Sequence, residues 1–194
     1  MTSDPTSDPP RLEVRECSVL HRGHSYDFEE LTVAYPDGIN RTKPIVRHRG
    51  AACIIPIIDS SSESGRGAEI VLVRNDRVTI EDVLLEVPAG GIDAGEDPIV
   101  AATRELEEET GYRAATVEPL GRFYTTPGMT DELMHVFVAR GLKHVGQKLE
   151  PYESLTVHRF SPGDLLGMIE RGEILDGKTI LALLLAVRKG VLAG

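Results

Sequence analysis

The sequence has few residues of several types, and each shortage argues against a class of protein. It has no Trp and only two cysteines, Cys17 and Cys53, which belong to no CxxC pair and suit a reducing compartment. The longest apolar runs, 51–58 and 180–187, fall far short of the roughly 18 residues that a membrane-spanning helix needs. No basic start followed by an apolar stretch opens the chain, so no secretory signal is expected. We therefore predict a cytoplasmic protein with no membrane partner.

Basic residues are also scarce. The 194 residues include 21 Lys and Arg against 31 Asp and Glu, which gives a formal net charge of -10. This balance disfavours a passive nucleic-acid binder, because contacts to phosphates need clustered cations. It still permits a phosphorylated small molecule if something else supplies positive charge. The acidity is concentrated in residues 93–109, where seven carboxylates stand against one arginine.

The order of apolar periods and turn residues predicts a layered α/β (α+β) fold. Residues 1–10 are polar and rich in Pro, which predicts a disordered tail. A β segment should follow, with two strands around the turn Pro36-Asp37-Gly38. Further strands are expected at 52–58, 70–74, 83–87, 133–139 and 155–160, and helices at 98–110, from Ser161 to near Gly172, and at 179–189.

The helix at 98–110 carries an acidic stripe. At about 100° per residue, Glu105, Glu108 and Glu109 share one arc, whereas Glu107 points outward. Like charges at this spacing repel by a few tenths of a kcal/mol per pair on an exposed helix. One interpretation is a solvated acidic face. The other is a site for a hard divalent cation such as Mg²⁺, which binds carboxylate and carbonyl oxygens.

The same stripe lies inside a longer motif. Residues 90–112 read GGIDAGEDPIVAATRELEEETGY. Gly90, Glu96, the Arg-Glu pair beginning at Arg104, and Gly111 stand at the spacing that resembles the Nudix box. The resemblance implies a Nudix-type α/β/α sandwich with a mixed sheet, an N-terminal antiparallel β extension, and Mg²⁺ or Mn²⁺ held at a diphosphate.

The resemblance also implies roles for residues of this motif. Glu105, Glu108 and Glu109 would be metal ligands, together with the carbonyl of Ala89. Arg104 would orient the carboxylates, and we assign Arg104 and Glu108 to catalysis as well.

Three flanking segments resemble the ADP-ribose pyrophosphatase branch of that family: 85–90 (LEVPAG), 124–132 (YTTPGMTDE) and 172–179 (GEILDGKT). This resemblance implies hydrolysis of ADP-ribose to AMP and ribose 5-phosphate by a homodimer. Residues 11–49 would form the dimerising extension, and 50–194 the hydrolase domain. A pyrophosphatase for another nucleotide sugar or dinucleotide is the alternative. A non-catalytic ADP-ribose sensor is less favoured, because every box carboxylate is kept.

Substrate contacts are expected from four residues. Arg74 and Arg77, in VLVRNDR, could bind phosphate or simply end a strand in solvent, and the resemblance favours Arg77. Glu86 is assigned to the substrate or the partner subunit, and Met129 to the substrate.

The catalytic base is expected outside the box. Glu153 precedes a late strand in a stretch that resembles the E-x-I-x-V pattern of this branch, and Glu150 is the alternative. Relatives carry a second acid where this chain has Thr156. The resemblance to this branch implies that Glu153 activates the attacking water.

Overall fold

The computed structural model describes residues 8–59, 67–149, 151 and 153–193. Most of the predicted tail and the alternative base Glu150 lie outside these residues. The described chain forms two compact units. One contains the residues up to His48 together with Thr126–Asp131, and the other contains the remainder from Arg49 on. The six residues 126–131 thus pack with the N-terminal segment, although sequence analysis placed them in the domain 50–194.

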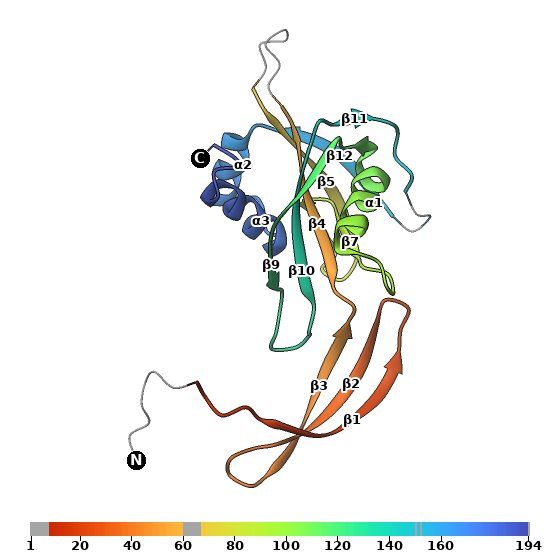
Figure 1. Cartoon of the computed structure of the whole chain (residues 1–194), viewed down its shortest axis with the longest axis vertical. Coiled ribbons are helices and arrows are strands. Elements are labelled where there is room, and N and C mark those ends of the chain that lie inside the picture. The colour runs from red at the N-terminus through yellow and green to blue at the C-terminus, as the bar shows by residue number, and fades with distance from the viewer. Residues whose placement is uncertain (1–7, 60–66, 150, 152, 194) are drawn as a thin grey trace. The chain divides into compact units, whose positions relative to one another are not determined.

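The first unit is a three-stranded antiparallel sheet of β1 (Glu13–Arg22), β2 (Tyr26–Ala34) and β3 (Asn40–His48), in chain order (Figure 1). The predicted turn joins β2 to β3, and Gly38 has a φ of 78°, which favours glycine. Strand β1 was not predicted, and all ten of its residues are exposed. Val46 of β3 donates its N–H to the Met129 carbonyl at 2.9 Å, so the segment 126–131 lies along β3.

The second unit is built on a mixed sheet with the order β12-β5-β4-β10-β9. Strand β10 runs parallel to β4, whereas the other pairs are antiparallel. Short strands β6 and β7 pair with β5 and β4, and β8 pairs with β11 apart from this sheet. The strand bounds are β4 (Ala51–Ile58), β5 (Glu69–Arg77), β6 (Asp82–Glu86), β7 (Ala89–Gly91), β8 (Tyr112–Arg113), β9 (Thr116–Tyr124), β10 (Leu133–Arg140), β11 (Lys143–His144) and β12 (Leu155–Phe160).

Strand β9 was missed from the sequence for an identifiable reason. It contains Pro119 and Gly121, which are normally depleted in strands. The structure accommodates them at one end of the sheet, where the pairing with β10 shifts register between Val136 and Phe137.

Helices cover both faces of this sheet: α1 (Pro98–Thr110) one face, α2 (Pro162–Glu170) and α3 (Gly177–Arg188) the other (Figure 1). Alternate residues of β4 pack against the helices on the two faces of the sheet, because successive side chains of a strand point to opposite faces. Ile54 packs in the cluster that contains Leu106 of α1, and Ile55 in the cluster that contains Leu183 of α3. The predicted α/β/α sandwich with a mixed sheet is confirmed.

The helix ends follow local signals. Asp97 caps α1 by accepting the Ile99 N–H at 3.0 Å, and Gly111 closes it with a φ of 70°. Helix α3 begins two residues before the predicted Thr179, because Asp176 is its N-cap. Among the helices of the described residues, none is long and apolar enough to cross a membrane.

Candidate active site

The site is built where β7 leads into α1. At Gly90, an added Cβ would stand only 1.9 Å from Oε1 of Glu105. A side chain at this position would displace the carboxylate of Glu105, because that carboxylate lies directly against the β7 backbone. The role of Gly90 is therefore steric: it leaves room for Glu105 of α1 to lie against β7.

Arg104 connects the loop to the acidic stripe. Its Nη1 donates to Glu105 Oε1 at 2.7 Å and to Glu108 Oε2 at 3.0 Å. Its Nη2 donates to the Gly91 carbonyl at 3.1 Å, and its Nε to Glu96 Oε1 at 3.2 Å. One guanidinium group thus fixes three carboxylates and the preceding loop, which is the arrangement expected of a residue that orients ligands.

Two carboxylates of the stripe are buried. Glu105 is 7% exposed and Glu109 is 4% exposed, and Glu109 accepts the Ala89 N–H at 3.2 Å. Burial raises the pKa of Glu105, although Arg104 acts in the opposite direction. Burial also raises the pKa of Glu109 to about 8, and the negative charges of Glu105 and Glu153 add to this effect. Burial and the repulsion between these acids therefore disfavour their ionised forms, because the surroundings supply too little positive charge to offset both effects.

Glu153 lies in the loop before β12 and is partly buried. Its charge acts on both Glu105 and Glu109, so the fold brings this residue within electrostatic reach of the acidic stripe. Only the tertiary structure could establish this proximity, because more than 40 residues separate Glu153 from Glu109 in the sequence.

The donor set fits a hard divalent cation. Glu105, Glu108 and Glu109 offer carboxylate oxygens, the ligand type that Mg²⁺ and Mn²⁺ prefer. Among the described residues, no three acidic, His or Cys side chains converge on one point, and Nη1 of Arg104 bridges Glu105 and Glu108. Arg104 and Glu108 also line an open hollow of about 620 Å³ beside α1.

Arg77 and Glu86, both expected to contact the substrate, contact each other. Arg77 donates to Glu86 through Nε at 2.7 Å and Nη2 at 2.6 Å, and Lys178 Nζ binds the same carboxylate. Glu86 is only 1% exposed; burial alone would raise its pKa, but the two cations hold that pKa below its usual value. Lys178 also pairs with Asp176 at 3.0 Å. Sequence analysis assigned Lys178 no role, although it lies in the segment GEILDGKT.

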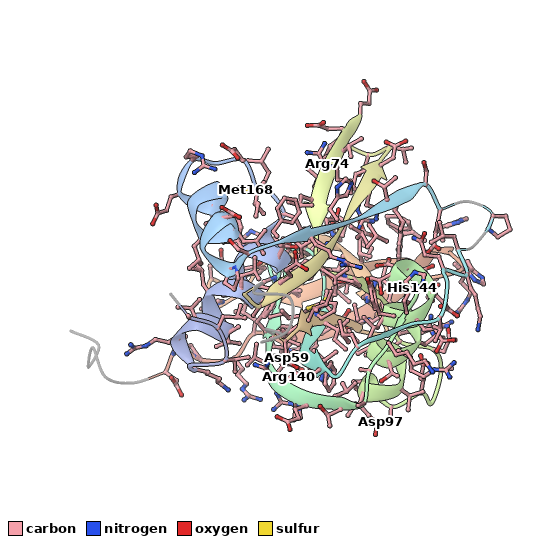
Figure 2. The ribbon with its side chains drawn as sticks, turned by 90° about the horizontal axis from the view of Figure 1, so that it is seen from above. Asp59, Arg74, Asp97, Arg140, His144 and Met168 are labelled. Atoms are coloured by element: carbon pink, nitrogen blue, oxygen red, sulfur yellow. The ribbon has the colours of Figure 1, made fainter. Side chains whose placement is uncertain are left out.

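The other two expected substrate residues, Arg74 and Met129, take no part in the contacts among Arg77, Glu86 and Lys178. Arg74 is exposed on β5, opposite Leu85 and Thr156 of the neighbouring strands. Figure 2 shows it at the edge of the domain away from Asp97, which caps α1. Met129 is 56% exposed and belongs to the N-terminal unit.

Comparisons with known proteins agree with this architecture. The sequence model of the NUDIX domain matches residues 47–183. The chain is 36% identical over 166 residues to the ADP-ribose pyrophosphatase of Bacillus subtilis, covering 84% of this chain and 86% of that protein. It is 38% identical over 152 residues to the methanol dehydrogenase activator of Bacillus methanolicus, covering 77% and 78%. The crystal structure of an ADP compounds hydrolase superposes with a TM-score of 0.79 at 23% identity, covering 96% and 97%. The box residues, the sandwich fold and these matches together show that the chain belongs to the Nudix family.

Proposed function

We propose that this protein hydrolyses the diphosphate of ADP-ribose to AMP and ribose 5-phosphate, with Mg²⁺ or Mn²⁺ as cofactor. The observation that carries the proposal is the acidic stripe of α1, in which Glu105 and Glu109 are buried with too little positive charge around them and offer oxygen ligands beside the backbone of β7. The similarity to an ADP-ribose pyrophosphatase supports the choice of substrate.

Glu105, Glu108 and Glu109 would hold the cation, with the carbonyl of Ala89 as a further ligand. When bound, the cation offsets phosphate charge and makes phosphorus more open to attack. Arg104 would keep Glu105 and Glu108 in place through its two Nη1 contacts. Because the protein is acidic as a whole, the diphosphate would be attracted mainly by the positive charge of the cation bound to these carboxylates.

Glu153 would act as general base. It accepts a proton from the attacking water as the new P–O bond forms and the bridging P–O bond of the diphosphate breaks. Attack at either phosphorus yields the same two products. The charge that Glu153 exerts on Glu105 and Glu109 supports its placement near the reacting group. Glu150 remains the alternative base.

Substrate binding would involve Arg77, Arg74, Glu86 and Met129. Glu86 engages Nε and Nη2 of Arg77, so Arg77 would present Nη1 to a phosphate oxygen while Glu86 fixes the guanidinium plane. Glu86 would thus act through Arg77.

The enzyme would work in the cytoplasm as a homodimer formed through its N-terminal sheet. The sheet of the first unit exposes apolar side chains that include Val14, Val19, Leu20 and Phe28. An exposed apolar surface of this kind is typical of protein interfaces. Both cysteines are free thiols, which suits a reducing compartment.

A substrate panel tests the proposal. The purified protein is incubated with Mg²⁺ or Mn²⁺ and, separately, ADP-ribose, other sugar nucleotides, NADH and nucleoside triphosphates, and the products are identified. We expect the highest kcat/KM for ADP-ribose, with AMP and ribose 5-phosphate as products. A higher value for another nucleotide would assign a sibling pyrophosphatase, and binding of ADP-ribose without turnover would assign a sensor.

The base is tested by Glu153→Gln. We expect a loss of at least a hundredfold in kcat, the usual scale for a general base. Glu118→Gln, at an exposed position of β9, is the matched control and should leave kcat within twofold. A loss of less than about tenfold for Glu153→Gln would remove Glu153 from this role.

A further inference from the structure

The last turn of α1 carries two of the proposed metal ligands, Glu108 and Glu109, and helix ends are where α-helices fray. The last four carbonyls of a helix have no partner within it. If this turn loosened, both carboxylates would move relative to Glu105 one turn earlier. The site therefore needs something outside the helix to hold its C-terminal end.

Residues 145–148, which we call the strap, cross this end of the helix. The side-chain Nε2 of Gln147 donates to the Glu109 carbonyl at 2.7 Å, and the Lys148 N–H donates to the Glu108 carbonyl at 3.0 Å. The Val145 N–H donates to the Gly111 carbonyl at 2.7 Å. The strap thus supplies donors to the backbone of both ligand residues, and only the bond from Gln147 depends on a side chain.

The final glycine of the box, Gly111, allows the strap to come close to the end of α1. Gly111 has a φ of 70°, which favours glycine. A Cβ at this position would lie 2.7 Å from the Gln147 nitrogen and 2.8 Å from the Gly146 carbonyl carbon, both backbone atoms. The close approach of the strap therefore requires glycine on steric as well as torsional grounds.

We infer that Gln147 is a positioning residue whose side-chain amide holds the last turn of α1 and keeps Glu108 and Glu109 placed for a divalent cation. The inference rests on the proposed metal site. Gln147 is itself an exposed residue, so its substitution removes the bond to Glu109 without opening the core.

The test compares Gln147→Met, which keeps much of the length of the side chain and loses the donor, with Lys148→Met. The control removes the exposed ion pair between Lys148 and Glu107, 2.9 Å long, and keeps the backbone bond to Glu108. Mn²⁺ binding to each full-length protein is titrated by electron paramagnetic resonance without substrate. Thermal unfolding with and without Mn²⁺ and the Mn²⁺ dependence of turnover are then recorded.

We expect Gln147→Met to raise the Kd for Mn²⁺ by fivefold to tenfold and to raise the Mn²⁺ concentration for half-maximal turnover by the same factor. The rate at saturating Mn²⁺ should stay within twofold of the parent, and Lys148→Met should change the Kd by less than twofold. An unchanged Kd in Gln147→Met would overturn the inference, even with a lower Tm, because a purely structural bond affects unfolding alone. If the parent protein itself binds no Mn²⁺, the metal site and this inference both fail; if it binds and Gln147→Met binds equally, only this inference fails.

Discussion

Glu86 and Glu109 are both glutamates buried in the second unit, and they differ in what surrounds the carboxylate. Glu86 is enclosed by Arg77 and Lys178, and these cations keep its pKa below the usual value despite burial. Glu109 accepts one backbone N–H and feels the charge of Lys178, but burial and the charges of Glu105 and Glu153 outweigh both and raise its pKa to about 8. A buried carboxylate that is paired with cations links the segments that carry those cations. A buried carboxylate without such a pair is suited to bind a metal cation.

The largest expected effect is on activity at Glu109. Glu109→Gln keeps the shape and removes a ligand charge, so we expect kcat/KM for ADP-ribose to fall about a thousandfold, or about 4 kcal/mol. The free energy of unfolding of the metal-free protein should stay equal or increase, because a crowded buried acid is removed. Glu107→Gln is the control: this residue lies two positions away on a different face of α1, pairs with Arg113 and Lys148, and its substitution should change kcat/KM by less than threefold. Equal losses in both variants would contradict a metal site on this face.

At Glu86 the expected effect is on stability. Glu86→Gln leaves Arg77 and Lys178 without their shared counter-charge, and we expect the free energy of unfolding to fall by about 3 kcal/mol in urea titrations. Glu173→Gln breaks an exposed pair with Arg171 and is the control, so its free energy of unfolding should stay close to that of the parent. If Glu86→Gln were as stable as the parent, the contrast between the two buried glutamates would not hold.

A smaller effect is expected at Gly90, whose substitution tests whether the position of the Glu105 carboxylate matters for metal binding. Gly90→Ala places a Cβ where Glu105 Oε1 now lies, so the carboxylate must move. We expect Mn²⁺ to bind 10- to 100-fold more weakly, the scale for disturbing groups that support metal ligands. Gly91→Ala is a matched control, since no heavy atom lies within 4 Å of its added Cβ, and its Kd should stay within twofold. Equal Kd values in the two variants would show that the position of Glu105 does not matter for binding.

The smallest expected effect is the pH dependence of the Glu86 contribution. The folded-state pKa of Glu86 lies below its value of about 4.3 in an unfolded chain. Its ionised form therefore stabilises the fold above that pH, and this stabilisation is lost as pH falls through the folded-state pKa. The difference in unfolding free energy between the parent and Glu86→Gln should be constant from pH 7 to 5 and shrink below pH 4. A difference independent of pH would show that the ionisation of Glu86 does not contribute.

The local part of the site was predictable from the sequence. Helix α1 has strong end signals in Asp97 and Gly111, and its 3.6-residue period places Glu105 and Glu109 on one face. The Arg104 contact to Glu108 follows from the same period, since the two residues are four positions apart, whereas the contact to the adjacent Glu105 does not. Whether the stripe is solvated was left open by the sequence, and burial of Glu105 and Glu109 in the structure answers it.

The partners that set the chemistry of these acids were not predictable in this way. Lys178 stands 92 positions from Glu86, and Gln147 stands 38 positions from Glu109. No period or spacing relates such residues, because their contacts arise only when α3 and the strap dock against the sheet and α1. The sequence by itself determined the Nudix motif, its helix and the acidic face, since these depend on near neighbours in the chain. Only the tertiary structure decided which buried acid is neutralised and which stays undercompensated, because that depends on the charges that distant segments bring to each one.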